Sequence, residues 1–188
     1  MRNLVILLLS FLALACSPTK PPITERPITW SQKLDTAGFG NFYKVDSILY
    51  RSEQPHTAGM TFLAGYGIKT VINLRHTRSD KREARKTNLI LTKVSINTWR
   101  LSYDDIVNTM KVINTCEKPV LIHCLHGSDR TGCMVAAYRM VFNGWTKEEA
   151  IREFREGGYG YHEKWFPGIL NILKSLDVEK LKKDAGVK

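Results

Sequence analysis

The stretch PVLIHCLHGSDRTGCMVAAYR, residues 119 to 139, restricts the fold of this chain more than any other part of the sequence. An apolar run ends on His123 and Cys124, a short polar loop with one glycine follows, and a helical pattern begins near Arg130. The order strand, tight loop, helix is typical of α/β proteins, in which ligands bind beyond the carboxyl ends of the strands. We therefore expect Cys124 at the tip of a buried strand, next to a helix N-terminus.

The remaining sequence repeats this alternation of strand and helix. Apolar runs predict strands within 41–55 (two short ones with a turn near Asp46) and at 69–75, 89–96 and 118–124. Helical patterns are found at 57–67, 78–88, 102–114, 129–143, 146–156 and 163–175. This order predicts an α/β fold with a mostly parallel central sheet flanked by helices on both faces.

Residues 1–15 are predicted to be a signal peptide and not part of this fold. They carry one early positive charge and an apolar run that is too short for a comfortable membrane span. Ala15 followed by Cys16 resembles a bacterial lipoprotein cleavage site, which implies that Cys16 is lipidated and becomes the mature N-terminus. Ser17 in place of aspartate implies export to the periplasm and anchoring to the outer membrane. A plain signal peptide cleaved nearby is the alternative.

Residues 16–30 are predicted to be a proline-rich tether, because four prolines between 17 and 30 favour an extended chain. The folded domain is then expected over 31–188. The net charge of +10 indicates an anionic ligand or partner, and no nucleic-acid-binding motif is present. With Cys16 assigned to the anchor, three cysteines remain, so at least one thiol is left without an internal disulfide partner.

The loop after residue 123 has the residue types of a phosphate site with a nucleophile at its base. Loop amides and the following helix N-terminus attract an anion and should also favour a thiolate at Cys124. Arg130 offers a planar fork for two phosphate oxygens. The expected substrate-binding residues are Leu125, His126, Gly127, Ser128, Asp129 and Thr131. The alternative is that Cys124 is only a small buried hydrophobic residue, which does not explain the arginine at this spacing.

HCLHGSDRTG resembles the Cys-x5-Arg-Ser/Thr signature of cysteine-dependent protein tyrosine and dual-specificity phosphatases. The stretches NFYKVDSILYRSEQP, GIKTVINLR and AAYRMVFNGWTKEEAIREFREGG are similar to exported bacterial TpbA-like phosphatases, so the resemblance covers roughly residues 38 to 160. It implies that Cys124 attacks phosphorus and forms a phosphocysteine and that Arg130 holds the phosphoryl oxygens. It also implies that Thr131 hydrogen-bonds the sulfur and that His123 sets the surroundings of the thiolate. No metal or organic cofactor is implied.

The aspartate that protonates the leaving group in this family has no clear counterpart here. Residues 81–103 contain no aspartate. Asp104 is the first candidate, with Asp105 beside it, although Ser102 and Asp105 also fit a helix capping box. Asp129 is a second candidate, as in myotubularin-like lipid phosphatases; its alternative is a structural aspartate that binds loop amides or a basic side chain. A third possibility is that none of these acts as the acid.

Three functions are therefore open, all with a phosphorylated substrate or ligand. The first is a protein tyrosine or dual-specificity phosphatase acting on phosphoproteins. The second is an inositol phosphate or phosphoinositide phosphatase, favoured by His126 and Asp129 in the loop and by the net positive charge. The third is a pseudophosphatase that binds phosphate without turnover. Arg51, Ser52 and Arg75 are further candidates for the border of the site. The basic run at 78–86 is expected to be a solvated helix face. Cys133 is expected to be a core thiol.

Overall fold

The computed structural model describes residues 25–35 and 38–187. Six strands form one sheet in the order β1-β2-β3-β6-β4-β5. Their bounds are β1 Gln32–Lys33, β2 Tyr43–Lys44, β3 Leu49–Ser52, β4 Thr70–Arg75, β5 Ile90–Ile96 and β6 Val120–His123. The strands β3, β6, β4 and β5 run parallel, and the short β1 and β2 add an antiparallel edge. The predicted α/β fold with a mostly parallel sheet is confirmed.

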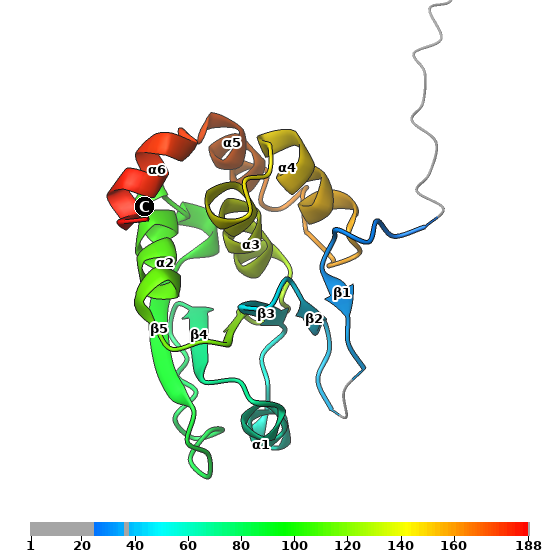
Figure 1. Cartoon of the computed structure of the whole chain (residues 1–188), viewed down its shortest axis with the longest axis vertical. Coiled ribbons are helices and arrows are strands. Elements are labelled where there is room, and N and C mark those ends of the chain that lie inside the picture. The colour runs from blue at the N-terminus through cyan, green and yellow to red at the C-terminus, as the bar shows by residue number, and fades with distance from the viewer. Residues whose placement is uncertain (1–24, 36–37, 188) are drawn as a thin grey trace, which may run out of the picture.

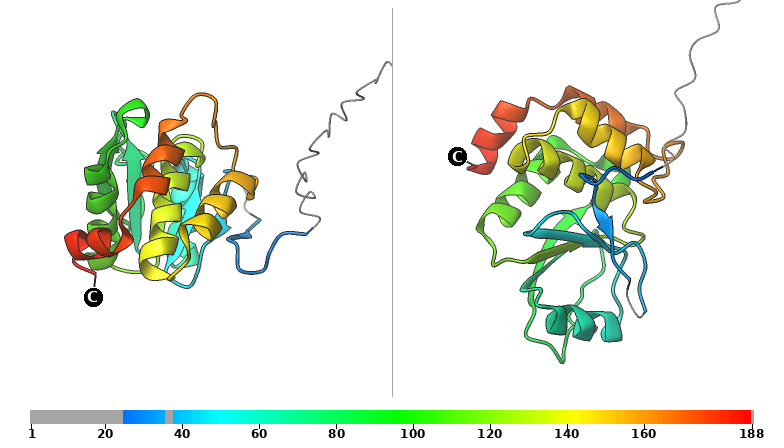
Figure 2. Two further views of the ribbon diagram at one scale, coloured as in Figure 1. Left: turned by 90° about the horizontal axis from the view of Figure 1, so that it is seen from above. Right: turned by 45° about the vertical axis from the view of Figure 1, so that its right-hand side comes forward.

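Helices cover both faces of this sheet (Figure 1, Figure 2). On one face lies α1, Thr57–Tyr66, which ends at Gly67 in a left-handed conformation. The other face carries α2 Tyr103–Thr115, α3 Asp129–Phe142, α4 Lys147–Glu156, α5 Gly168–Ser175 and α6 Val178–Ala185. None of the described helices is long and apolar enough to cross a membrane. The predicted signal peptide, Cys16 and most of the tether lie outside the described residues.

The two central strands supply side chains to both layers of core. Val71 and Leu121 pack with α1, whereas Ile72 and Ile122 belong to the larger cluster beneath α2 and α3. Successive residues of a strand point to opposite faces, so a strand covered on both sides is apolar at every position. This burial explains why β4 and β6 appear in the sequence as continuous apolar runs.

The turn between β2 and β3 lies at Asp46, as predicted, and the Asp46 side chain stabilises it. Asp46 Oδ1 accepts hydrogen bonds from the backbone N–H groups of Ile48 and Leu49, at 2.8 and 2.9 Å. Aspartate often closes turns in this way, because its carboxylate replaces a backbone acceptor. The second oxygen accepts from Tyr138 and Asn143 at the end of α3, so the same residue ties the turn to the helix layer.

Two helix predictions differ from the structure, and a third helix has no counterpart among the predictions. The charged segment 78–88 is not a helix but a series of turns, in which only Asp80 and Ala84 are buried. A helix on a protein surface is stabilised mainly by an apolar face packed against the core, and this segment has none. The helix predicted from 163 begins only at Gly168, after Pro167, because Trp165 and Phe166 form a turn on the carbonyl of His162. The helix α6 was not predicted.

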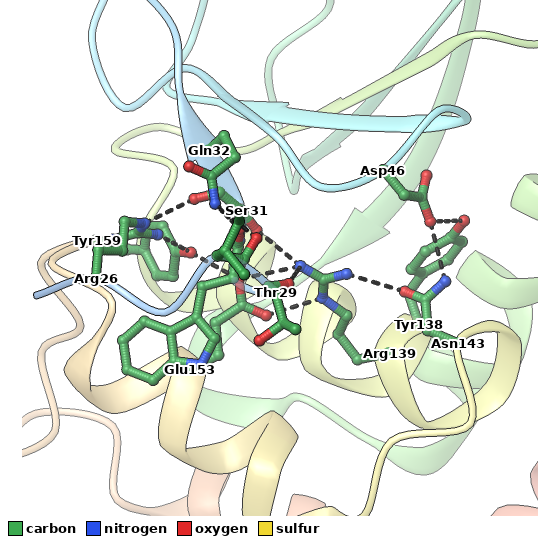
Figure 3. Close-up of polar contacts among 12 residues, drawn as sticks. Arg26, Thr29, Ser31, Gln32, Asp46, Tyr138, Arg139, Asn143, Glu153 and Tyr159 are labelled. Atoms are coloured by element: carbon green, nitrogen blue, oxygen red, sulfur yellow. Dashed lines mark hydrogen bonds and ion pairs between the residues drawn. The ribbon is translucent and has the colours of Figure 1, made fainter.

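A buried ion pair joins α3, α4 and the start of the described chain (Figure 3). Arg139 Nε lies 2.8 Å from Glu153 Oε2, and the side chains are 4% and 2% exposed. Glu153 Oε1 also accepts from the backbone and hydroxyl of Ser31, both at 2.6 Å. Burial raises the pKa of Glu153, but the bonds from Arg139 and Ser31 and the charge of Arg139 outweigh it, so the net pKa lies below its usual range. Arg26 continues this network into the segment predicted as tether, with bonds to Gly157 and to Tyr159 Oη.

We expect Arg139→Met to lower the free energy of unfolding by about 3–5 kcal/mol, because it leaves the Glu153 carboxylate buried without its charged partner. Urea denaturation followed by circular dichroism measures this change. The control is Arg82→Met, which removes an exposed ion pair with Glu83 and should cost less than about 1 kcal/mol. Equal losses in the two variants would contradict a structural role for the buried pair.

Candidate active site

The loop 124–128 lies at the carboxyl edge of the sheet, between the end of β6 and the start of α3. Cys124 is 2% exposed, whereas Leu125 and His126 are exposed on the outer lip of the loop. The loop is tied to the neighbouring strand through Gln54, whose N–H donates to the Leu125 carbonyl at 3.1 Å. At the start of α3 the N-cap residue makes no side-chain cap bond. The first amides of a helix lack partners within it, so this end of α3 offers donors to an anion.

Gly127 is required at its position by both backbone conformation and space. Its φ angle of +70° lies in the left-handed region that side chains disfavour. An added Cβ would lie 2.6 Å from the carbonyl oxygen of Ser52 and 2.7 Å from the N–H of Glu53. Both obstacles are backbone atoms at the end of β3. The loop therefore packs directly on β3, which is how Ser52 borders the site.

Arg51 lies fully buried beneath this loop. Its Nη2 donates to the carbonyl of Gly127 at 2.5 Å, and its guanidinium stacks 3.6 Å from the ring centroid of Tyr159. Its buried Nε has no hydrogen-bond partner among the described residues. Burial lowers the pKa of Arg51, while Tyr159, Glu153 and Cys124 oppose that change. The charge of Arg51 therefore interacts electrostatically with Cys124.

Arg130 and Arg75 bring two more cations to the same edge of the sheet. Arg130 Nη1 donates weakly to the carbonyl of Ile96 at the end of β5, at 3.4 Å, and its buried Nε has no partner among the described residues. Arg75 Nη1 donates to Gln54 Oε1 at 3.0 Å. Burial lowers the pKa of Arg75, and the charges of Arg78 and Arg130 lower it further. Asp80 and Cys124 raise the pKa and offset part of this change. Buried donors in native proteins are normally paired, so the Nε groups of Arg51 and Arg130 are donors that can bind a further acceptor.

His123 is held by an aspartate that the sequence did not single out. Its Nδ1 lies 3.1 Å from the Cys124 carbonyl and its Nε2 lies 2.9 Å from Asp80 Oδ2. Asp80 also accepts from Asn73 and Gln54. Burial raises the pKa of Asp80, but these bonds and the charge of His123 outweigh it, so the net pKa lies below its usual range. The role of Asp80 could not be predicted from the sequence, because Asp80 lies in a run of charged residues and no spacing distinguishes it.

The three predicted acid candidates have different surroundings. Asp104 is exposed in the first turn of α2. Asp105 forms the predicted capping box with Ser102, whose backbone and hydroxyl donate to Asp105 Oδ2 at 2.9 and 3.0 Å. Asp129 is 7% exposed and binds His162, through the backbone N–H at 2.9 Å and through Nδ1 at 3.0 Å. Asp129 thus binds a basic side chain, as expected of a structural aspartate, and the amide from which it accepts belongs to His162.

Two further residues of the sequence analysis are buried. The hydroxyl of Thr131 has no hydrogen-bond partner among the described residues, so the expected bond to the sulfur is absent in this structure. Cys133 lies fully buried in α3, where burial raises the pKa of its thiol well above the usual range. That environment fits the core thiol that we expected.

Residues 39–167 match a family model described as the tyrosine phosphatase family. The chain belongs to this family. It is 29% identical over 137 residues to the dual specificity protein phosphatase TpbA of Pseudomonas aeruginosa, a match that spans 72% of this chain and 62% of the relative. The crystal structure of P. aeruginosa TpbA superimposes with a TM-score of 0.77 at 26% identity, covering 86% of this chain and 99% of that one. The predicted family and fold are both confirmed.

A second group of relatives carries a different name. An inositol diphosphatase of Arabidopsis thaliana is 25% identical over 151 residues, which span 76% of this chain and 72% of the relative. The catalytic domain of a PP-IP phosphatase from S. cerevisiae has the same fold, with a TM-score of 0.68 at 20% identity over 81% of this chain and 94% of that one. The chain is thus similar both to dual-specificity protein phosphatases and to inositol diphosphatases.

We expect Gly127→Ala to lower kcat/KM for an aryl phosphate by roughly 100-fold, because displacing the loop from β3 by a few tenths of an ångström or more misplaces its donors. Steady-state kinetics with para-nitrophenyl phosphate measures this effect. The matched control is Gly65→Ala in α1, where no atom lies within 4 Å of the added Cβ. That variant should keep full activity; an equally active Gly127→Ala variant would show that the close packing is not needed.

Proposed function

We propose that the protein hydrolyses phosphomonoesters through a phosphocysteine on Cys124, with phosphotyrosine-bearing proteins as the first substrate class. The observation that carries the proposal is the pair of buried, unpartnered Nε groups of Arg51 and Arg130 beside a loop that holds a cysteine. A phosphoryl group brings oxygen acceptors that such guanidinium donors bind well. TpbA, a relative at 29% identity, is named a dual specificity protein phosphatase, and a TpbA variant has been crystallised with phosphotyrosine.

In the first step the sulfur of Cys124 attacks phosphorus and the bond to the leaving oxygen breaks. The loop amides and the guanidinium of Arg130 hold the non-bridging oxygens while charge redistributes among them. In the second step water attacks the phosphocysteine, phosphate leaves and the thiolate returns. The buried hydroxyl of Thr131 has no other partner among the described residues, and it would donate to the sulfur as the S–P bond breaks.

An aromatic cavity between the segment that follows β5 and the start of α5 supports a phosphotyrosine substrate. Trp99 and Phe166 pack edge to face with centroids 4.8 Å apart, and Trp165 is 66% exposed beside them. These residues line a cavity of about 390 Å³. The chain just before each lining segment contacts the first residues of α3, through Ile96 with Arg130 and through His162 with Asp129. Exposed aromatic side chains of this kind bind peptide and aryl groups effectively.

A second candidate, an inositol phosphate or diphosphate substrate, is favoured by a separate, basic cavity. A cavity of about 500 Å³ is lined by Arg75, Arg78 and Arg82, among other residues. Gln54 also lines this cavity, and its backbone N–H donates to the Leu125 carbonyl, so the cavity adjoins the loop that holds Cys124. Several arginines next to one phosphate site suit a substrate with more than one phosphate group.

We expect Cys124→Ser to abolish turnover of an aryl phosphate, because the less reactive hydroxyl replaces the only nucleophile of the proposed mechanism. Arg130→Lys should lose most of the rate, since a single ammonium does not reproduce the planar two-bond contact. Activity with para-nitrophenyl phosphate and trapping of a phosphoenzyme measure both effects. Binding of phosphate by an inactive wild-type protein would instead support a pseudophosphatase.

The substrate class is tested with a phosphotyrosine peptide and inositol hexakisphosphate, compared on two variants. We expect the peptide to have the higher kcat/KM, and Trp165→Ala to lower its value about tenfold, the usual cost of losing an exposed aromatic anchor. Replacing Arg78 and Arg82 together with alanine should leave the peptide rate unchanged. A faster reaction with inositol hexakisphosphate, lost in the double arginine variant, would favour the second candidate.

A further inference from the structure

Three contacts hold the segment Tyr159–His162 on the outer side of the catalytic loop. Asn41 Nδ2 donates both to the carbonyl of His126, at 2.8 Å, and to the carbonyl of Tyr159, at 2.9 Å. Gly160 lies so close to Ser128 that an added Cβ would be 3.3 Å from its hydroxyl oxygen. The backbone N–H of His162 donates to Asp129. The imidazole of His162 is therefore fixed at the loop through backbone as well as side-chain bonds.

The His162 ring forms a dyad with Asp129. Its Nδ1 lies 3.0 Å from Oδ2 and 3.2 Å from Oδ1 of that carboxylate, which is 7% exposed. An ionised carboxylate only accepts hydrogen bonds, so Nδ1 carries the proton of this contact and Nε2 is the nitrogen left for other chemistry. The His162 side chain is 45% exposed, and its ring centroid lies 5.8 Å from that of His126 on the outer lip. Asp129 directly precedes Arg130, so the dyad adjoins the residue that binds phosphate in the proposed mechanism.

The charged surroundings of His162 come from three elements. Asp129, at the start of α3, supplies the direct negative charge. His126 faces the ring from the loop. On its own segment Glu163 follows in the chain, but Glu163 is paired with Arg155 of α4 at 2.9 Å. Asp129 is therefore the carboxylate in direct contact with the imidazole, in the arrangement by which a carboxylate orients a catalytic histidine.

The proposed reaction lacks an evident proton donor. The sequence has no aspartate between 81 and 103, Asp104 is exposed, and Asp105 caps its helix. We propose that His162, oriented by Asp129, is the general acid of the first step and the general base of the second. This inference rests on the proposed function. Histidine commonly fills both roles because it gives and takes protons near neutral pH.

The proton balance of the two steps is complete. As the sulfur of Cys124 forms its bond to phosphorus, the electron pair of the breaking P–O bond goes to the leaving oxygen, which takes the proton from His162 Nε2. In the second step neutral His162 takes a proton from water, the hydroxyl oxygen bonds to phosphorus, and the S–P electron pair returns to sulfur. Phosphate leaves, and His162 is again protonated.

The test compares His162→Asn with His76→Asn across aryl phosphates of graded leaving-group strength. His76 is also exposed near the carboxyl edge of the sheet and has its own bond, to Ser95, so it is a matched control. His162→Asn should slow phenyl phosphate roughly 100- to 10,000-fold, the usual contribution of a general acid, and slow dinitrophenyl phosphate much less. Added imidazole should restore part of the rate of the His162→Gly variant. The control should behave as wild type.

Three results would overturn the assignment of His162. These are an equal loss with all leaving groups and no rescue by imidazole, unchanged kinetics in His162→Asn, or a selective loss with poor leaving groups in Asp104→Asn instead. Each of these results can be distinguished from a failure of the proposed function. That failure is an absence of Cys124-dependent turnover with every substrate, including dinitrophenyl phosphate, which needs little help from an acid.

Discussion

The buried guanidinium of Arg51 connects the catalytic loop to the rest of the molecule. It donates to the carbonyl of Gly127 and stacks on Tyr159, so it joins β3, the loop and the segment that follows α4. A charge removed from water is costly unless nearby groups compensate for it. Part of that compensation comes from Glu153 and from the Tyr159 ring. The position of the loop thus depends on the buried charge of Arg51, which Glu153 and Tyr159 from outside the sheet help to stabilise.

Tyr159 is where this arrangement meets the ion-pair network of the helix layer. Its hydroxyl donates to Glu153 Oε1 at 2.9 Å and accepts from Arg26, while its ring lies over Arg51. Burial raises the pKa of Tyr159 to about 12, so the phenol stays protonated and keeps donating at neutral pH. The network in Figure 3 therefore reaches the site through one side chain. Residues that pack the N-terminal segment and residues that support the loop after β6 therefore belong to one connected set of contacts.

The sequence predicts the sheet and the loop that follows β6 because their signals are local. The apolar runs of β4 and β6, the glycine of the loop and the spacing of Cys124 from Arg130 are all short-range patterns. The partners of the loop are not local: Asp80 lies 43 residues before His123, and His162 lies 33 residues after Asp129. No periodicity connects such pairs. The prediction of a helix at 78–88 is wrong for a related reason. The charges of this segment suggest a solvated helix face, whereas the Asp80 side chain is buried.

The same long-range contacts affect how the chain becomes functional. Seventy-six residues separate Arg51 from Gly127, and 118 separate Asn41 from Tyr159. Closing chain segments of this length costs entropy before any contact is gained, and such contacts slow folding. The loop is therefore in place only when nearly the whole native topology has formed. Recovery of catalysis during refolding accordingly reports the last tertiary contacts, and a chain that has regained its helices and sheet but not these contacts is still inactive.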